Sequence, residues 1–345
     1  MSFKPHFLGA LIATLPLVGH AQPQVSLYGI ADVGLQSISS GAVSRTAMQS
    51  GGSMQSRWGI RGSEDLGGGL RANFLFESRI DLTDGSLFQG TMFGGRSVVG
   101  LAGKAGSVHL GLDYNPIFFT KLKSLAFGVA PYGETQTVMR QGTIRARNAI
   151  KYDSRDWNGW KFAAIVSSGD GNPANSAAGR NAGFSVDYEK GPLWVGLATT
   201  RIQVQSDVVH ATQESTLGAR YDLGRTRLLA NLWEFRTDNR TAPDAKIRVI
   251  SLGTQTKVGP NGTVLASLSH RNQISPTPAA ANDAVQLTLG YEHALSRRTL
   301  LYTHWVRVDN RNNSNVSVRG VPNSGVGTGN VSDPRAFQVG MRHMF

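Results

Sequence analysis

The sequence has no cysteine, so neither a disulfide framework nor a thiolate metal site is available to it. Beyond the first 21 residues it also lacks any apolar run that approaches the ~18 residues of a membrane-spanning helix. No proline-rich or serine-rich linker divides the chain. These absences exclude a helical membrane protein and predict one domain over residues 22–345.

The amino terminus predicts export. Lys4 precedes an apolar run, Phe7 to Val18, and Gly19-His20-Ala21 follows it at the place where a signal peptidase cleaves. We expect residues 1–21 to be a cleaved signal peptide and Gln22 to begin the mature chain. The alternative is an uncleaved anchor.

Positive charge is in excess, with 35 Lys and Arg against 23 Asp and Glu and a formal net charge of +12. Such a balance is compatible with nucleic-acid binding. The basic residues, however, are scattered through strand-like segments, often two residues apart, and form no run. We therefore expect them to line one wall of a sheet, and we expect no nucleic-acid partner.

Apolar and polar residues alternate along most of the chain, which is typical of β-strands. At the carboxyl terminus Phe337, Val339 and Met341 alternate with Gln338, Gly340 and Arg342. Short turns and longer polar loops alternate between such segments. The pattern predicts sixteen strands, at 24–39, 53–64, 70–81, 93–103, 107–114, 144–153, 159–168, 181–189, 193–204, 212–223, 226–237, 246–258, 263–272, 284–294, 298–309 and 335–345.

A barrel of this width cannot fill its interior with polar side chains, so we expect the polar faces to surround water and the apolar faces to meet lipid. The sequence thus predicts an all-β, sixteen-stranded antiparallel transmembrane barrel. The facing of strand 246–258 stays open because it alternates poorly. Aromatic residues near strand ends fit interfacial girdles or ordinary packing; they are Tyr152, Trp157, Trp160, Trp194, Tyr221, Tyr302 and Trp305.

Four motifs are spread over the whole mature chain: Ser26-Leu27-Tyr28-Gly29 with Asp32, the long segment Ser56 to Leu70, Gly95-Arg96 with Val99-Gly100-Leu101, and Arg342-His343-Met344-Phe345. Together they resemble the general diffusion porins of β-proteobacteria. The resemblance implies an outer-membrane homotrimer in which each barrel has its own pore, narrowed by a long third loop folded into the lumen. Small anions and hydrophilic solutes are then the expected partners, with lipid around the barrel and no cofactor or metal.

A long loop is also predicted from the sequence alone, independently of the resemblance, because about thirty residues separate Tyr114 from Ile144. It is too apolar for a solvated surface loop, although an extracellular lid is the alternative. We expect its charges, with the residue before it, to contribute to the constriction: Asp113, Lys121, Lys123, Glu134 and Arg140. Three basic residues and one acidic residue within the loop give 3 − 1 = +2.

The resemblance places a basic cluster on the wall opposite this loop, and alternation supplies the inward-facing candidates: Arg57, Arg61, Arg96, Arg145 and Arg147. The alternative is that some of them only pair with Asp32, Glu77 or Asp113. A net positive constriction in water predicts a moderate preference for anions.

Other functions have less support. An enzyme needs a nucleophile beside a base, and the histidines of this chain lack a companion motif. A barrel adhesin would use polar loops such as 169–180 and 310–332, although solvated loop tips explain them equally. A channel specialised for one solute is the remaining alternative.

Overall fold

The computed structural model describes residues 24–40, 43–139, 144–169, 171, 177–274, 282–312, 314, 316–318 and 333–345. The predicted signal peptide and Arg140 lie outside these residues. No helix in the described part of the chain is long and apolar enough to cross a membrane.

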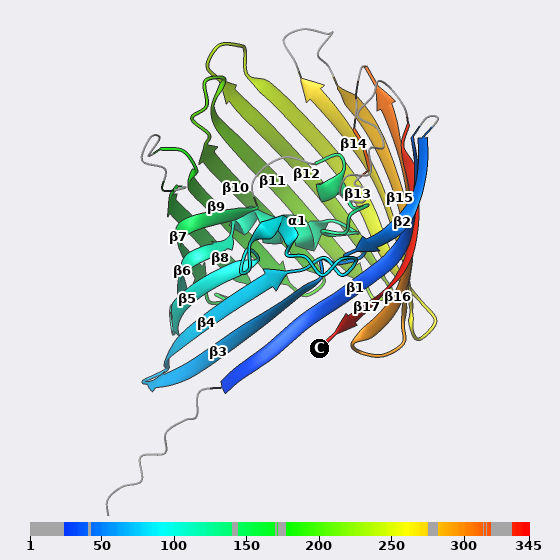
Figure 1. Ribbon diagram of the computed structural model, residues 1–345. Coiled ribbons are helices and arrows are strands. Elements are labelled where there is room, and N and C mark those ends of the chain that lie inside the picture. The colour runs from blue at the N-terminus through cyan, green and yellow to red at the C-terminus, as the bar shows by residue number, and fades with distance from the viewer. Residues whose placement is uncertain are drawn as a thin grey trace, which may run out of the picture.

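The described residues form one antiparallel sheet whose strands surround an interior (Figure 1). The strands are β1 (Gln24–Ser40), β2 (Val43–Ser50), β3 (Arg57–Gly67), β4 (Leu70–Arg79), β5 (Arg96–Gly103), β6 (Gly106–Tyr114), β7 (Arg145–Ser154), β8 (Trp160–Ser168), β9 (Arg180–Lys190), β10 (Leu193–Gln203), β11 (Val209–Leu223), β12 (Thr226–Asn239), β13 (Ala245–Val258), β14 (Gly262–Ile274), β15 (Asp283–Ala294), β16 (Thr299–Arg311) and β17 (Arg335–Met344). Three short helices lie in loops, α1 (Pro116–Ser124), η1 (Phe88–Gly90) and η2 (Glu134–Gln136).

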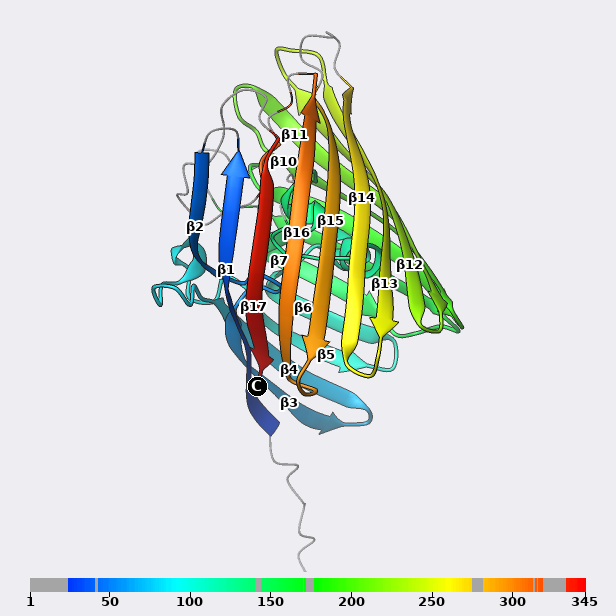
Figure 2. The same cartoon turned by 90° about the vertical axis from the view of Figure 1, so that its right-hand side faces the viewer.

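The wall closes where the first strand meets the last. β1 pairs with β17 from Ile30–Met344 to Ser39–Arg335, and the two strands lie side by side in Figure 2. The other edge of β1 pairs with β2 over its second half and with β3 over its first half. The seventeen strand segments therefore occupy sixteen positions around the wall, which confirms the predicted sixteen-stranded barrel.

The region before β3 differs from the prediction. The sequence predicts a loop from residue 40 to residue 52 and a strand that begins at Ser53. In the structure, residues 43–50 form β2, and the predicted strand is β3, which begins at Arg57. Residues 51–56 leave the wall between β2 and β3, and the Asp32 carboxylate accepts hydrogen bonds from the backbone N–H groups of Gly52, Ser53 and Met54 at 2.9, 3.0 and 2.7 Å. This inner turn, residues 51–56, is held by a buried contact that period-two alternation does not encode.

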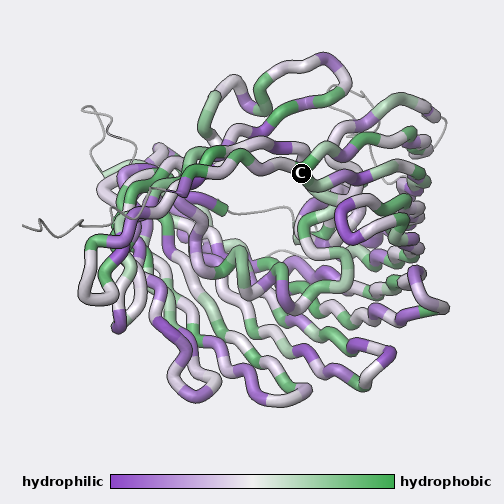
Figure 3. Tube along the Cα trace, turned by 90° about the horizontal axis from the view of Figure 1, so that it is seen from below, coloured by the Kyte–Doolittle hydropathy of each residue, from purple (hydrophilic) through white to green (hydrophobic). Residues whose placement is uncertain are grey.

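Apolar side chains face outward and polar side chains face inward. On β15, Leu287 and Leu289 are exposed, whereas Gln286 and Thr288 between them are fully buried. β13, whose facing the sequence left open, follows the same rule, with Ile250 and Leu252 exposed and Ser251 buried. Hydrophilic and hydrophobic residues alternate along the strands in Figure 3. An outer surface of leucine and valine is suited to lipid.

The aromatic residues divide between the two faces. Trp157, Trp160 and Tyr221 are exposed, as a girdle requires, but Trp194 and Tyr302 are buried on the inner face. Tyr302 donates a hydrogen bond to Asp32 Oδ1 at 2.7 Å. For these two residues the packing alternative is the correct one.

The described part of the long loop, residues 115–139, lies against the inner wall. α1 begins with Pro116, whose fixed φ suits a first helical position, and packs mainly on β9, β10 and β11 (Figure 1). After α1 the chain follows the wall further round, where inward side chains of β13 to β15 bind its backbone: Gln255 to Ala126 O at 2.7 Å, Arg271 to Val138 O at 2.8 Å and Gln286 to Tyr132 O at 2.9 Å. The loop is therefore bonded to one side of the wall.

Candidate functional site

Three arginines on the opposite side of the wall form an arginine cluster, defined as Arg57, Arg79 and Arg145. The tight turn at Gly67–Gly69, where all three glycines have positive φ, joins β3 to β4 and sets a register in which Arg57 faces Arg79. Arg145 begins β7 and faces Tyr114 at the end of β6. Directly paired residues lie on the same face of a sheet, so the register brings the first two guanidinium groups together.

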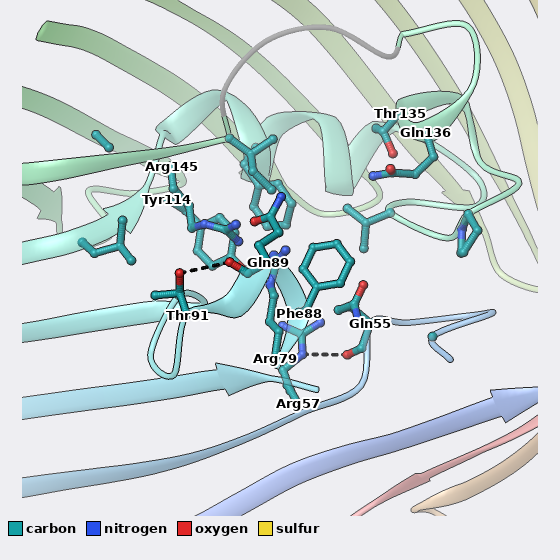
Figure 4. Close-up of a pocket in the computed structure, with 18 of the residues that line it drawn as sticks. Gln55, Arg57, Arg79, Phe88, Gln89, Thr91, Tyr114, Thr135, Gln136 and Arg145 are labelled. Atoms are coloured by element: carbon teal, nitrogen blue, oxygen red, sulfur yellow. Dashed lines mark hydrogen bonds between the residues drawn. The ribbon is translucent and has the colours of Figure 1, made fainter. Parts of the chain in front are cut away.

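Neighbouring groups hold each guanidinium in place (Figure 4). Arg57 donates from Nε to the Gln55 carbonyl of the inner turn at 3.1 Å, and its Nη1 lies 3.5 Å from Glu77 Oε1. Arg79 donates to the Tyr114 hydroxyl at 2.9 Å, and Arg145 lies over the Tyr114 ring at 5.6 Å. Among the described residues, no carboxylate comes within ion-pair distance of Arg79 or Arg145.

A cavity of about 880 Å³ opens between the arginine cluster and the long loop. Its basic lining residues are Arg57, Arg79, Lys121, Arg145 and Arg147, and Asp81 is the acidic residue among its described lining. Phe88, Tyr114 and Phe118 supply aromatic surface beside the arginines. Unpaired guanidinium groups are tolerated in such a place only when water or an anion solvates them.

The charges of the long loop are directed to the wall. Lys121 is buried and forms an ion pair with Glu214, which also accepts a hydrogen bond from Trp233 Nε1 at 2.6 Å. Lys123 lies 2.9 Å from Asp187 Oδ2 and over the Trp194 ring. Glu134 is fully buried, accepts a hydrogen bond from Ser251 at 3.2 Å, and has its pKa raised by that burial. The formal charge of +2 counted from the sequence is therefore largely compensated by the wall.

The structure separates the five arginines that the sequence singled out. Arg57, Arg145 and Arg147 line the cavity beside the long loop. Arg61 and Arg96 line a second cavity, and Arg96 is paired with Asp113 at 2.8 Å, as the alternative interpretation held. Asp113 ends β6 on the wall and thus precedes the loop.

Arg79 is missing from the predicted site, although alternation places it on the inward face of its strand. The sequence feature that could have identified Arg79 is its position opposite Arg57 in the hairpin formed around the Gly67–Gly69 turn. The loop partners Asp187 and Glu214 had no local signal, since they lie 64 and 93 residues from the lysines they bind.

A family model described as Gram-negative porin matches residues 8–313. The chain is a Gram-negative porin. The porin is 34% identical over 342 residues to outer membrane porin protein 32 of Delftia acidovorans, covering 94% of this chain and 95% of that protein. This family membership makes it an outer-membrane channel and not an enzyme.

Solved structures agree with this assignment. The anion-selective porin from Comamonas acidovorans is 31% identical, with a TM-score of 0.82 over 94% of this porin and 100% of that chain. A trimer form of in-vitro folded OmpT from Vibrio cholerae is 16% identical, with a TM-score of 0.70 over 94% and 99% of the two chains, and supports the fold alone.

Proposed function

We propose that this porin forms a water-filled channel that favours small anions moderately over cations, with its constriction between the arginine cluster and the long loop. The observation that carries the proposal is the charge balance of the 880 Å³ cavity, where five basic residues meet one acidic residue. The lysine among them is paired with Glu214, so the uncompensated charge comes from arginines of the wall.

The expected strength of the preference follows from simple electrostatics. Two unit charges ~5 Å apart in water interact by about 0.8 kcal/mol, and several arginines act on a passing ion together. Screening acts over ~8 Å at physiological salt, so ions crossing the cavity still sense the arginines. Glu77 beside Arg57 and Asp81 in the lining reduce the field without reversing it. A moderate preference is therefore expected, and the anion-selective porin from Comamonas acidovorans supports it by similarity.

Export and assembly complete the proposal. The apolar segment before Gly19-His20-Ala21 supports a cleaved signal peptide over residues 1–21. Homotrimerisation is proposed from family membership, since porins of this fold include a trimeric form.

Reversal potentials across a planar bilayer in a salt gradient test the function. The wild type should give the sign of an anion-preferring channel, and Arg57→Ala/Arg79→Ala should move the potential towards zero. Lys104→Ala removes one exposed positive charge from the β5–β6 turn outside the cavity and serves as the control. A wild-type potential of the opposite sign would contradict the proposal.

A further inference from the structure

A second cavity of about 490 Å³ lies on the inner face of β1 and β3 to β6, on the short-turn side of the arginine cluster. We name it the short-turn cavity; its polar lining residues are Gln24, Ser26, Arg61, Ser63, Asn73, Arg96 and His109. Arg61 follows Arg57 by four residues on β3, so the two α-carbons lie ~13 Å apart along the strand. The short-turn cavity therefore holds a second group of basic residues along the channel, next to the arginine cluster.

Arg61 is held in one orientation. Its Nε donates to Ser26 Oγ at 3.2 Å, and its guanidinium lies 5.2 Å from the centre of the Tyr28 ring. The Tyr28 hydroxyl is fixed in turn by Glu77 Oε2 at 3.0 Å. Among the described residues, no carboxylate lies within ion-pair distance of Arg61. Its two terminal nitrogens therefore form a pre-organised fork for a ligand that accepts two hydrogen bonds.

The surrounding charges leave the short-turn cavity positive. Arg96 lines the cavity, and one of its terminal nitrogens forms an ion pair with Asp113. Its buried Nε has no hydrogen-bond partner. His109 lies 3.5 Å from Asp113 and 3.7 Å from Asp153, and Lys151 lies 3.2 Å from Asp153. The described lining of the cavity itself contains two permanent cations, Arg61 and Arg96, and no carboxylate. Outside the lining, Lys151 is paired with Asp153, and Glu77, which lies opposite Arg96 on β4, is shared with Arg57.

We propose that the short-turn cavity is a second anion subsite, suited to a small divalent oxyanion. Arg61 offers its two terminal nitrogens as a planar fork that fits the paired oxygens of such an ion better than it fits chloride, and Arg96 adds a second positive charge to the same lining. The Asn73 amide and the Ser26 hydroxyl add neutral polar groups at the same wall. An anion that leaves the arginine cluster binds next in the short-turn cavity, so permeation passes through two binding sites in sequence. This inference rests on the proposed anion channel and adds a binding step to it.

Sulfate is the probe, because it is a dianion throughout the neutral pH range. Single-channel chloride current through the full mature protein is recorded while sulfate is added to one side of the bilayer and then to the other, at constant ionic strength. Sulfate should reduce the current with a measurable half-inhibitory concentration. Arg61→Gln should raise that concentration by roughly fivefold, because one charge-assisted hydrogen-bonding group is lost in a solvated site. Arg61→Lys should give an intermediate value.

Lys104→Gln is the matched control, since it removes one positive charge from the exposed β5–β6 turn at the same end of the barrel. It should leave the half-inhibitory concentration unchanged. An Arg61→Gln channel blocked by sulfate like the wild type, or a Lys104→Gln effect of equal size, would overturn the subsite. Reversal potentials of the same channels judge the proposed function separately: an anion-preferring channel without Arg61-dependent block refutes the subsite alone.

Discussion

At the scale of single residues, the electrostatic repulsion within the arginine cluster destabilises the sheet, which indicates that the cluster has a functional role. Arg57 and Arg79 are direct cross-strand neighbours, and like charges in that position destabilise a sheet. Glu77 is the carboxylate close to the pair, 3.5 Å from Arg57, and it also accepts the Tyr28 hydroxyl. The repulsion therefore remains incompletely balanced, which suits a group that acts on ions in transit.

Glu77→Gln should strengthen the anion preference. The amide retains an acceptor for Tyr28 but removes the negative charge beside Arg57, so the anion-to-cation permeability ratio should rise roughly two- to fourfold. Reversal potentials in a potassium chloride gradient measure the ratio. Glu64→Gln, at an exposed position near the short turn of β3, should leave it unchanged. A ratio that falls in Glu77→Gln would show that Glu77 mainly holds Arg57 in place.

Glu134 should make the stability of the barrel depend on pH. Burial raises its pKa above the value of 4.5 that it has in the unfolded chain. A folded state with the higher pKa is favoured by protonation, so this contribution is complete below pH 4.5 and is lost as pH rises through the folded-state pKa. The thermal midpoint of Glu134→Gln should exceed that of the wild type at neutral pH and approach it in acid. A constant difference between the two curves would rule this out.

At the scale of elements, two ion pairs attach α1 to the wall, and their burial differs. The side chains of Lys121 and Glu214 are each 4% exposed, whereas Lys123 and Asp187 are 32% and 12% exposed. A buried charge that loses its partner costs far more than an exposed one. The first pair should therefore dominate the attachment of the long loop.

The unfolding free energies of three variants test this difference. Glu214→Gln alone leaves the Lys121 ammonium buried without its counter-charge and should lower the free energy of unfolding by about 3 kcal/mol. Lys121→Met/Glu214→Gln should recover most of that loss. Asp187→Asn, beside the half-exposed Lys123, should cost about 1 kcal/mol or less. Denaturant unfolding of the detergent-folded barrel supplies the values, and equal costs for Glu214→Gln and Asp187→Asn would refute the argument.

Strands were predictable because alternation is a local property, and β15 and β17 read clearly from the sequence. The same rule accounts for two further inward side chains: Trp194 alternates with the exposed Leu193, and Arg79 lies opposite Arg57. The inner turn was not predictable, since Asp32 binds its backbone N–H groups from another strand. Contacts of this kind are tertiary, and no window of sequence contains both partners.

At the scale of the whole molecule, Phe345 extends the contact between the first and last strands of the barrel. Phe345 exchanges two backbone hydrogen bonds with Gly29, at 3.0 and 3.1 Å, beyond the paired residues of β1 and β17. The Phe345 ring lies over Gly29 so closely that a Cβ there would come within 2.2 Å of its Cζ atom. The absence of a side chain at residue 29 therefore lets the Phe345 ring pack against β1.

Gly29→Ala should weaken closure by displacing the Phe345 ring, at a cost of about 1–3 kcal/mol for forced overpacking. Gly103→Ala is the control, because the nearest atom to a Cβ there is 3.7 Å away, in ordinary contact. Phe345→Ala should also destabilise the barrel, and Gly29→Ala should cost less in that background than in the wild type, because the ring is gone and the Arg57 carbonyl, 2.8 Å from the new Cβ, is the contact left to relieve. Denaturant unfolding of the folded barrel measures all four variants. Fully additive losses would mean that Gly29 and Phe345 act on the seam independently, and that the ring contact does not close the barrel.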